Sequence, residues 1–204
     1  YDQLPHPLTG YLRKQLKAIS KVGELSYRVF CGPDLRWEHF EAMFALNAKS
    51  RYAYLYATEE ERAFARALFD LTQGRDWLEI DLLYLGEQPV AFNHGFNMGG
   101  RHEGWRMGFD GDYYKYGPGK LLSMHMIRSY FERGFRELDL LRGVESYKNE
   151  WQPLPRRFIH LRAVPRLKLL AVLDFLTLPR LHVLWNQLIA RLRPPHSEEP
   201  PAQG

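Results

Sequence analysis

The hydrophobic pattern changes from helical spacing to strict alternation between residues 78 and 109, and this change limits the folds open to the chain. Alternation is the spacing of strands with one buried face, and tight turns join strands that run antiparallel. Turn residues separate three such runs, at Gly86-Glu87 and Gly99-Gly100. We therefore predict a three-stranded antiparallel meander whose faces are Leu78, Ile80, Leu82 and Tyr84, then Val90, Phe92, His94 and Phe96, then Trp105, Met107 and Phe109.

Helical spacing returns directly after the meander. Residues 119–133 carry an apolar arc, Gly134 is a stop signal, and a short apolar run follows at 137–141. The arc consists of Leu122, Met126, Ile127, Tyr130 and Phe131. A helix between two strands of one sheet is a crossover connection, which leaves those strands parallel. We therefore expect 137–141 to pair in parallel with the third meander strand.

Upstream of the meander, the pattern predicts three helices and one strand. We expect a loose segment at 1–9, a helix that follows a Thr9 cap, and a strand at 25–30. Two further helices follow, one after Gly32-Pro33-Asp34 and one that begins with a Thr58 capping box. Their buried residues are expected to be Trp37, Phe40 and Phe44 in the first, and Phe64, Leu68 and Leu71 in the second. The predicted order is α-β-α-α-β-β-β-α-β.

The C-terminal quarter is basic and amphipathic. We expect a strand at 158–164 that completes a domain of residues 10–165, then amphipathic helices in 166–193 and a disordered tail at 194–204. The helices carry an apolar stripe made of Leu181, Leu184, Trp185, Leu188 and Leu192. This stripe packs on the same domain or on an upstream domain, or it makes a peripheral contact with an anionic membrane surface.

Composition argues against several kinds of site. The formal net charge is only +4, and the basic residues of the first helix have no interleaved aromatic side chains, which disfavours a nucleic-acid partner. Cys31 is the single cysteine, so a reducing, cytoplasmic compartment fits best. The eight histidines lack metal-ligand spacing, and we expect no metal. The chain begins with Tyr1 rather than Met, as a C-terminal portion of a longer protein with an upstream domain would.

The motif that carries chemistry is the glycine loop at 116–120, where the third meander strand gives way to a helix. Glycines let the backbone approach an anion closely, and the first N–H groups of a helix supply donors and a positive dipole end. Lys115 and Lys120 add positive charge. The loop therefore suits a pyrophosphate group, although glycine and proline also occur as ordinary punctuation where a helix begins.

These motifs resemble those of the GNAT acyltransferases. That family has a Q/R-x-x-G-x-G/A loop between its fourth strand and the next helix; Gly117 and Gly119 match the small positions, and Tyr114 stands at the Q/R position. The runs 115–122 and 137–143, followed by Tyr147, Lys148 and Trp151, resemble the CelD-like acetyltransferases, which are associated with cellulose and exopolysaccharide synthesis and related to FemAB-like transferases. The resemblance covers about residues 10–165 and implies an α/β GNAT fold, with a mixed, mostly antiparallel sheet, a splayed parallel pair and flanking helices.

The resemblance also implies a site. Acetyl-CoA or another acyl-CoA would lie between the two parallel strands, against Trp105, Met107 and Phe109, with its phosphates on Lys115, Tyr116, Gly117, Pro118, Gly119 and Lys120. Tyr147 would protonate the departing thiolate, unless it is a hydrogen-bonded core phenol. The candidates for the base are Glu145, Asp139 and His94, in that order; Arg142 and Lys148 either bind an acidic acceptor or pair with Asp139 and Glu145.

We therefore expect an enzyme that moves an acyl group from acyl-CoA to an amine or hydroxyl of a small, sugar-like or cell-surface precursor, in the cytoplasm or at the inner face of the membrane. One alternative is a FemAB-like transferase that uses aminoacyl-tRNA, with the basic C-terminal quarter facing RNA. Another is a catalytically silent module in a polysaccharide-synthesis complex. The glycine loop favours the first reading, because a pyrophosphate cradle has no role in the other two.

Overall fold

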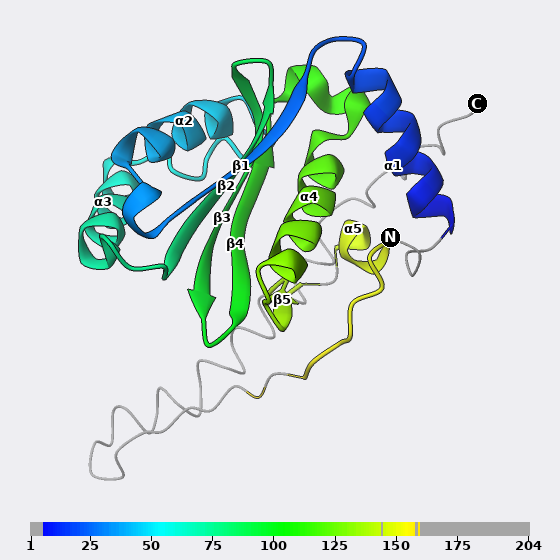
Figure 1. Ribbon diagram of the computed structural model, residues 1–204. Helices are drawn as coiled ribbons and strands as arrows, with labels where there is room; N and C mark the ends of the chain where they lie inside the picture. The colour runs from blue at the N-terminus through cyan, green and yellow to red at the C-terminus, as the bar shows by residue number, and fades with distance from the viewer. Residues whose placement is uncertain (1–5, 144, 158, 160–204) are drawn as a thin grey trace, which may run out of the picture. The chain divides into compact units, whose positions relative to one another are not determined.

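The computed structural model describes residues 6–143, 145–157 and 159. The chain divides into two compact units, Tyr1–Leu154 and Pro155–Gly204. The first unit holds the sheet and the helices that Figure 1 labels. The helices expected in 166–193, the tail, and all but Ile159 of the strand expected at 158–164 lie outside the described residues.

The described elements follow the predicted order and add one short helix. The helices are α1 His6–Ile19, α2 Trp37–Ala48, α3 Glu59–Thr72, α4 Pro118–Glu132 and α5 Ser146–Asn149. The strands are β1 Leu25–Cys31, β2 Leu78–Leu85, β3 Gln88–Met98, β4 Arg101–Phe109 and β5 Glu137–Asp139. Short 3-10 helices at Gly32–Asp34 and Gly111–Tyr116 precede α2 and α4.

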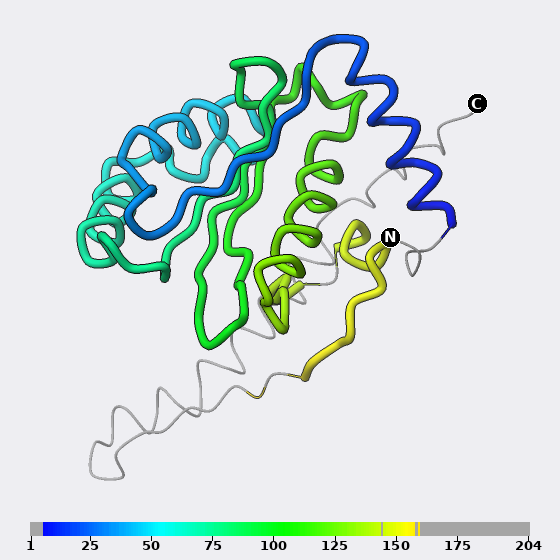
Figure 2. The backbone as a smooth tube through the Cα atoms, viewed as in Figure 1, coloured from blue at the N-terminus to red at the C-terminus, as the bar shows by residue number. Residues whose placement is uncertain are grey.

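The strands form one five-stranded sheet in the order β1-β2-β3-β4-β5. Neighbouring strands are antiparallel, except that β5 pairs in parallel with β4. Figures 1 and 2 show α2 and α3 on one face of the sheet and α4 and α1 on the other. The predicted mixed α/β sheet with one parallel pair and flanking helices is confirmed.

The sheet supports a hydrophobic core on each face because β2 is buried on both sides. Leu78, Ile80 and Leu82 belong to the core with α2 and α3, whereas Leu83 and Leu85 belong to the core with α1 and α4. Full burial of a side chain of this size contributes about 1.5–3 kcal/mol. Side chains from both faces of β2 therefore pack against helices. The alternation in the sequence predicts only the face of Leu78, Ile80, Leu82 and Tyr84.

Two irregularities in strand pairing change which side chains share a face. Between β2 and β3 the register shifts at Leu83/Tyr84, and Val90 joins Ala91 in the core with α1 and α4. The prediction that Val90 shares a face with Phe92 is wrong for this reason. A bulge adds one residue to a strand and interrupts its alternation.

The second irregularity lies between β3 and β4, at His94/Gly95. Trp105 is the extra residue of β4, and its ring packs against His94 and Phe96 on the side of α2 and α3. Met107 packs in the other core. Simple alternation predicts that Trp105 and Met107 share a face, and the bulge makes this prediction wrong.

Some predicted helix boundaries and faces also differ. Helix α1 begins at His6, so Thr9 lies inside it and residues 6–9 are not loose. Thr58 caps α3 as predicted, because its hydroxyl accepts the Glu61 N–H at 3.2 Å. The buried face of α3 is Ala65, Phe69 and Thr72, whereas Phe64 and Leu71 are exposed; on α4, Phe131 is 83% exposed. The sheet decides which face of a helix is covered, and the helical spacing does not reveal where the sheet lies.

Candidate functional site

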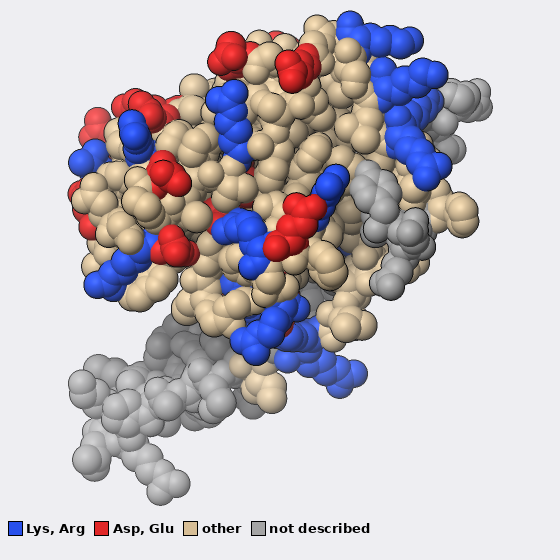
Figure 3. All heavy atoms as spheres, in the orientation of Figure 1, with Lys and Arg blue, Asp and Glu red and all other residues tan. Residues whose placement is uncertain are grey.

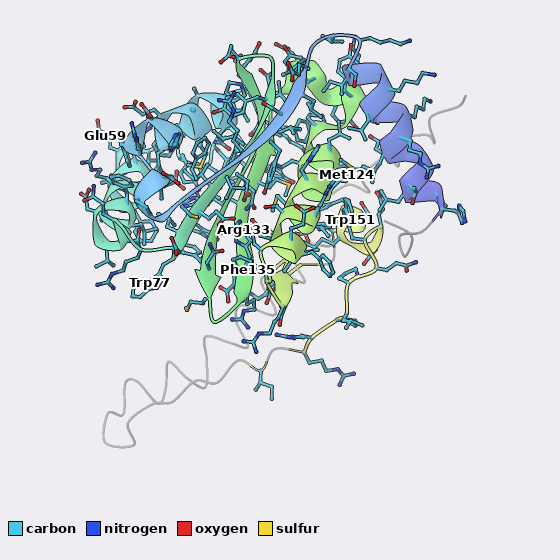
Figure 4. All side chains as sticks on the ribbon, viewed as in Figure 1. Glu59, Trp77, Met124, Arg133, Phe135 and Trp151 are labelled. Carbon is cyan, nitrogen blue, oxygen red and sulfur yellow. The ribbon has the colours of Figure 1, made fainter. Side chains whose placement is uncertain are left out.

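A cleft of about 520 Å³ opens between β4 and the chain that follows β5, with α4 along one side. Beyond the apolar side chains of β4 and α4, its lining includes Asn93 and Ser123, and the segment after β5 contributes Arg142, Glu145, Tyr147 and Lys148. Trp151 lies beside α4 and α5 and closes part of the cleft (Figure 4). Most of the polar candidates from the sequence therefore meet at one place.

The cleft exists because the parallel pair is short. β5 pairs with β4 only from Glu137 to Asp139, while β4 continues as far as Phe109. The Asp139 side chain accepts the Leu141 N–H at 2.7 Å, and Leu141 adopts a positive φ of 57°, which turns the chain away from β4. The edge of β4 beyond Glu103 is left without a strand partner among the described residues.

The glycine loop stands where α4 begins. Gly117 is left-handed (φ 60°, ψ 48°), and the Tyr11 hydroxyl of α1 occupies the space that a side chain at this position would need. The Gly117 N–H donates to the Tyr114 carbonyl, and the Lys120 N–H donates to the Gly117 carbonyl. Pro118 has no N–H, and the Gly119 N–H has no backbone acceptor among the described residues. Gly119 therefore carries the first free donor of the helix.

The lysines of the loop already have partners. Lys120 Nζ lies 2.7 Å from a Glu150 carboxylate oxygen and 4.5 Å from the centre of the Tyr11 ring. Lys115 Nζ lies over the Tyr116 ring at 5.0 Å. On the face shown in Figure 3, basic side chains gather along α1, next to this loop. A phosphate that took Lys120 as counter-charge would have to replace Glu150.

The wall that follows β5 holds one phenol, one carboxylate and one buried ammonium. Tyr147 is 40% exposed, and burial, with the nearby Glu145 and Tyr52, raises its pKa, so the phenol keeps its proton at neutral pH. The Lys148 ammonium donates to Glu145 at 2.8 Å and to the Arg142 carbonyl at 3.0 Å. The hydrogen bond from Lys148 lowers the pKa of Glu145, which is therefore ionised. Lys148 is thus engaged in positioning this wall.

Two other candidates do not line the cleft. The Asp139 side chain caps the turn after β5 through its hydrogen bond to Leu141. His94 is fully buried on the face of α2 and α3, where its Nδ1 lies 2.8 Å from the Tyr56 hydroxyl. Burial lowers the pKa of His94 to about 3. The structure therefore brings Tyr147, Glu145, Arg142 and Lys148 together and leaves Asp139 and His94 outside the cleft.

The cofactor candidates on β4 divide between the cleft and the core. Trp105 and Met107 line the cleft, whereas Phe109 packs beneath Gly119, where an added Cβ would lie 3.2 Å from its ring. Sequence reasoning missed Asn93 and Ser123, which also line the cleft. The sequence offers one signal for Asn93: the alternation of β3 puts it on the face of the sheet opposite to that of His94.

Within the described part of the chain, no group of three or more His, Cys, Asp or Glu side chains is placed to hold a metal ion, and no helix is both long and apolar enough to cross a membrane.

The fold defines a class of α/β protein, one whose mixed sheet ends in a short parallel strand pair beside the helix that connects the two strands. The sequence identifies the family: residues 9–149 match the acetyltransferase (GNAT) domain, and the chain belongs to this family of acetyltransferases. The suggested GNAT fold and acyltransferase activity are thereby confirmed. No curated protein matches the sequence.

Solved structures with a similar fold are distant in sequence. The ribosomal-protein-S18-alanine N-acetyltransferase of Escherichia coli has 18% identity and a TM-score of 0.45, over 62% of this chain and 75% of that one. The aminoglycoside acetyltransferase AAC(6')-Iy, in complex with a CoA bisubstrate analogue, has 14% identity and a TM-score of 0.49, over 70% of this chain and 100% of that one. An aminoglycoside acetyltransferase from an uncultured soil metagenomic sample, bound to sisomicin, has 13% identity and a TM-score of 0.49, over 70% and 97% of the two chains.

Proposed function

We propose that this GNAT domain transfers an acetyl or other acyl group from acyl-CoA, held in the cleft between β4 and β5, to an amine or hydroxyl of a small or sugar-like acceptor. The observation that carries the proposal is the position of the cleft. It joins the edge of β4 that has no strand partner among the described residues to a wall with a protonated phenol beside an ionised carboxylate. The first turn of α4, which begins after Gly117, lies outside the cleft lining and precedes Ser123, the first α4 residue of that lining.

The residues around the cleft suit acyl-CoA. The α4 dipole and the Gly119 N–H would attract the phosphates, with Lys115 and Lys120 close by. The edge of β4 from Trp105 to Phe109 offers backbone groups to the amides of the pantetheine arm. The surrounding Met107, Met126 and Ile127 side chains are apolar, as a site for an alkyl chain requires. Acyl-CoA supplies an activated thioester, so the protein has to orient the reactants and move protons.

Proton transfer in this site falls to Tyr147 and Glu145. The new bond to the acyl carbon forms as the acceptor loses a proton, and Glu145, which is ionised, is the carboxylate in the cleft that would take it. The C–S bond breaks as Tyr147 gives its proton to the departing thiolate. The low pKa of Glu145 makes it a weak base, which suits an acceptor whose proton leaves late, after the new bond has begun to form.

The acceptor class comes from the resemblance to CelD-like acetyltransferases, whose association with exopolysaccharide genes points to a sugar-like or cell-surface precursor. Arg142 lines the cleft with an exposed side chain and is the residue that would meet an acidic group of that acceptor. Most of the C-terminal quarter, for which a membrane contact or an RNA-facing surface is suggested, lies outside the described part of the chain. An upstream domain of the same protein stays a proposal of the same kind.

Binding of acetyl-CoA, measured by isothermal titration calorimetry, tests the proposal. Ile127→Trp would push an indole into the cleft and should weaken binding at least tenfold, because Ile127 lines the cleft from α4. Phe131→Trp, one turn further along the same helix, is the matched control: Phe131 is exposed outside the cleft, and this variant should bind like the parent. A parent chain without affinity for acetyl-CoA, or equal binding by all three proteins, would refute the proposed cleft.

A further inference from the structure

A chain of buried polar side chains runs across β2, β3 and β4 beneath α4. Asn93 Nδ2 lies 2.9 Å from Asp81 Oδ2 and 3.1 Å from His102 Nε2. His102 Nδ1 lies 2.7 Å from Asn97 Oδ1, and Asn97 Nδ2 donates to Glu79 at 2.8 Å. Arg133, at the end of α4, closes the chain with two hydrogen bonds to Glu79, at 3.0 and 2.6 Å (Figure 4). The proposed transfer reaction uses none of these groups.

The directions of these hydrogen bonds follow from the donors available. An amide nitrogen only donates, so His102 Nε2, 3.1 Å from Asn93 Nδ2, has to be the unprotonated nitrogen of the ring. The proton is then on Nδ1, which donates to Asn97 Oδ1. Burial lowers the pKa of His102 to about 4, which agrees with a neutral ring. Each group therefore donates in the direction of Glu79: Asn93 to His102, His102 to Asn97, and Asn97 to Glu79.

Both N–H groups of Asn93 are consumed inside this network, one by Asp81 and one by His102. The opposite orientation of the amide is disfavoured, because its oxygen would then face the unprotonated His102 nitrogen and an Asp81 oxygen that already accepts from the Tyr130 hydroxyl. Asp81 is itself held by the Tyr130 hydroxyl at 2.8 Å and by the Tyr27 hydroxyl. Asn93 Oδ1 consequently has a fixed direction.

That direction is toward the cleft. A Cβ built on Gly104 would lie 3.3 Å from Asn93 Oδ1, and both residues line the cleft. Within the described residues, no group donates a hydrogen bond to this oxygen. Asn93 is only 1% exposed, and the missing side chain of Gly104 leaves a narrow opening beside the acceptor that the network has oriented.

We infer that Asn93 Oδ1 is a binding group for the co-substrate and accepts a hydrogen bond from an amide N–H of the pantetheine arm. The inference rests on the proposed function, and it adds a side chain from β3 to a site otherwise made of β4, α4, β5 and the segment after β5. The buried network has the role of orienting this one oxygen.

The position of Asn93 favours the arm of CoA as the source of the donor. Asn93 lies on the α4 side of the sheet, and the cleft lining continues from it to Met126 and Ser123. Along α4, Ser123 is about 7.5 Å and Met126 about 12 Å from Pro118, at the usual rise of 1.5 Å per residue. A ligand with its phosphates at the start of α4 would therefore pass Ser123 before its arm reaches Asn93.

The test removes the donor from the ligand and the acceptor from the protein in turn. Two CoA analogues are needed, each with one pantetheine amide replaced by an ester, and their dissociation constants are compared with that of CoA by calorimetry. One ester should bind the parent chain about 3- to 10-fold more weakly than CoA, the range of a single hydrogen bond. In Gly104→Ala, whose methyl group covers Oδ1 while the network stays intact, the ratio should fall to about 1.

The ratio of two affinities within one protein cancels general effects on the cleft. Ser123→Ala is the control, because it also alters the cleft wall but does not contact Asn93, and it should keep the ratio of the parent. Asn93→Ala should give a ratio of about 1 if it folds; Gly104→Ala decides the question if it does not. Equal binding of CoA and both esters by the parent, or an unchanged ratio in Gly104→Ala, would overturn the inference. Failure of the parent to bind CoA at all would instead refute the proposed function.

Discussion

Replacing His94 with phenylalanine should change how the stability of the fold depends on pH. His94 is fully buried, its Nδ1 lies 2.8 Å from the Tyr56 hydroxyl, and the rings of Phe40 and Trp105 pack against it edge to face. Burial, followed by the charges of Arg106 and His102, lowers the pKa of His94 from 6.5 to about 3. The residue is therefore a neutral core histidine throughout the physiological range.

The sign of the effect follows from the direction of this shift. Because the pKa is lower in the folded chain, the unfolded chain takes up the proton first as the pH falls. The stability contributed by neutral His94 is complete above pH 6.5 and is lost as the pH falls toward 3. Each pH unit in this window corresponds to about 1.4 kcal/mol, so lowering the pH from well above 6.5 to 4.5 costs about 2.7 kcal/mol through this residue.

The phenylalanine variant should start lower and fall less. At neutral pH it loses the partner of the Tyr56 hydroxyl, at a cost of about 2 kcal/mol for a buried polar group. It has no proton to take up, so the curves of unfolding free energy against pH should cross about 1.5 pH units below 6.5, near pH 5. Asp81 and His102, whose pKa values are also shifted, titrate in both proteins; the coupling of His102 to His94 is lost in the variant, but it is a smaller cause of the His94 shift than burial.

Urea unfolding followed by tryptophan fluorescence at several pH values between 7.5 and 4.5 would measure the two curves. Tyr56→Phe is the matched control, since it removes the same hydrogen bond but keeps His94; its curve should lie below that of the parent and run parallel to it. If the curve for His94→Phe also runs parallel to the parent, the imidazole is not buried and neutral in the folded chain, and the reasoning fails.

Three further outcomes test the site. Tyr147→Phe should lower kcat by ~10²-fold with little change in the acetyl-CoA dissociation constant, and activity within a few-fold of the parent would place the acid elsewhere. Lys148→Met removes the hydrogen bond that lowers the pKa of Glu145, so the acid limb of the kcat/KM profile should move to higher pH; a fixed limb would exclude Glu145 as the base. Gly117→Ala should lower the unfolding free energy by about 1–3 kcal/mol, because the backbone is left-handed and Tyr11 fills the side-chain space. Adding Tyr11→Phe to the Gly117→Ala variant should restore part of that loss in thermal denaturation, and a melting temperature of Gly117→Ala equal to that of the parent would contradict this packing.

The order of strands and helices could be predicted because it depends on spacing within single segments. Alternation from 78 to 109 and helical spacing in 119–133 are local signals, and the parallel pairing of β5 follows from the crossover helix. The faces of Val90 and Trp105 could not be predicted, because each depends on a register shift against a neighbouring strand. A register shift belongs to a pair of strands, and neither strand reveals it alone.

The same limit explains which site residues were found. Tyr147, Glu145, Arg142 and Lys148 follow a predicted strand in the sequence, and the structure brings them together because they are close along the chain. Asn93 was missed because its partners, Asp81 and His102, come from the two neighbouring strands and meet it only through sheet pairing. A polar residue in the middle of a strand has no local pattern that separates a structural role from a binding role.

The two neighbours on β3 show how the sheet separates these roles. His94 and Asn93 point to opposite faces, and each is held by hydrogen bonds in a buried setting. Tyr56 and several aromatic rings surround His94, which is fully buried and does not line the cleft, so it cannot reach an acceptor there. Both N–H groups of Asn93 donate to Asp81 and His102 in the buried network, and its oxygen is directed at the cleft beside Gly104. Since β3 offers the cleft an oriented acceptor rather than a proton carrier, the proton transfers of the proposed reaction have to come from the wall after β5.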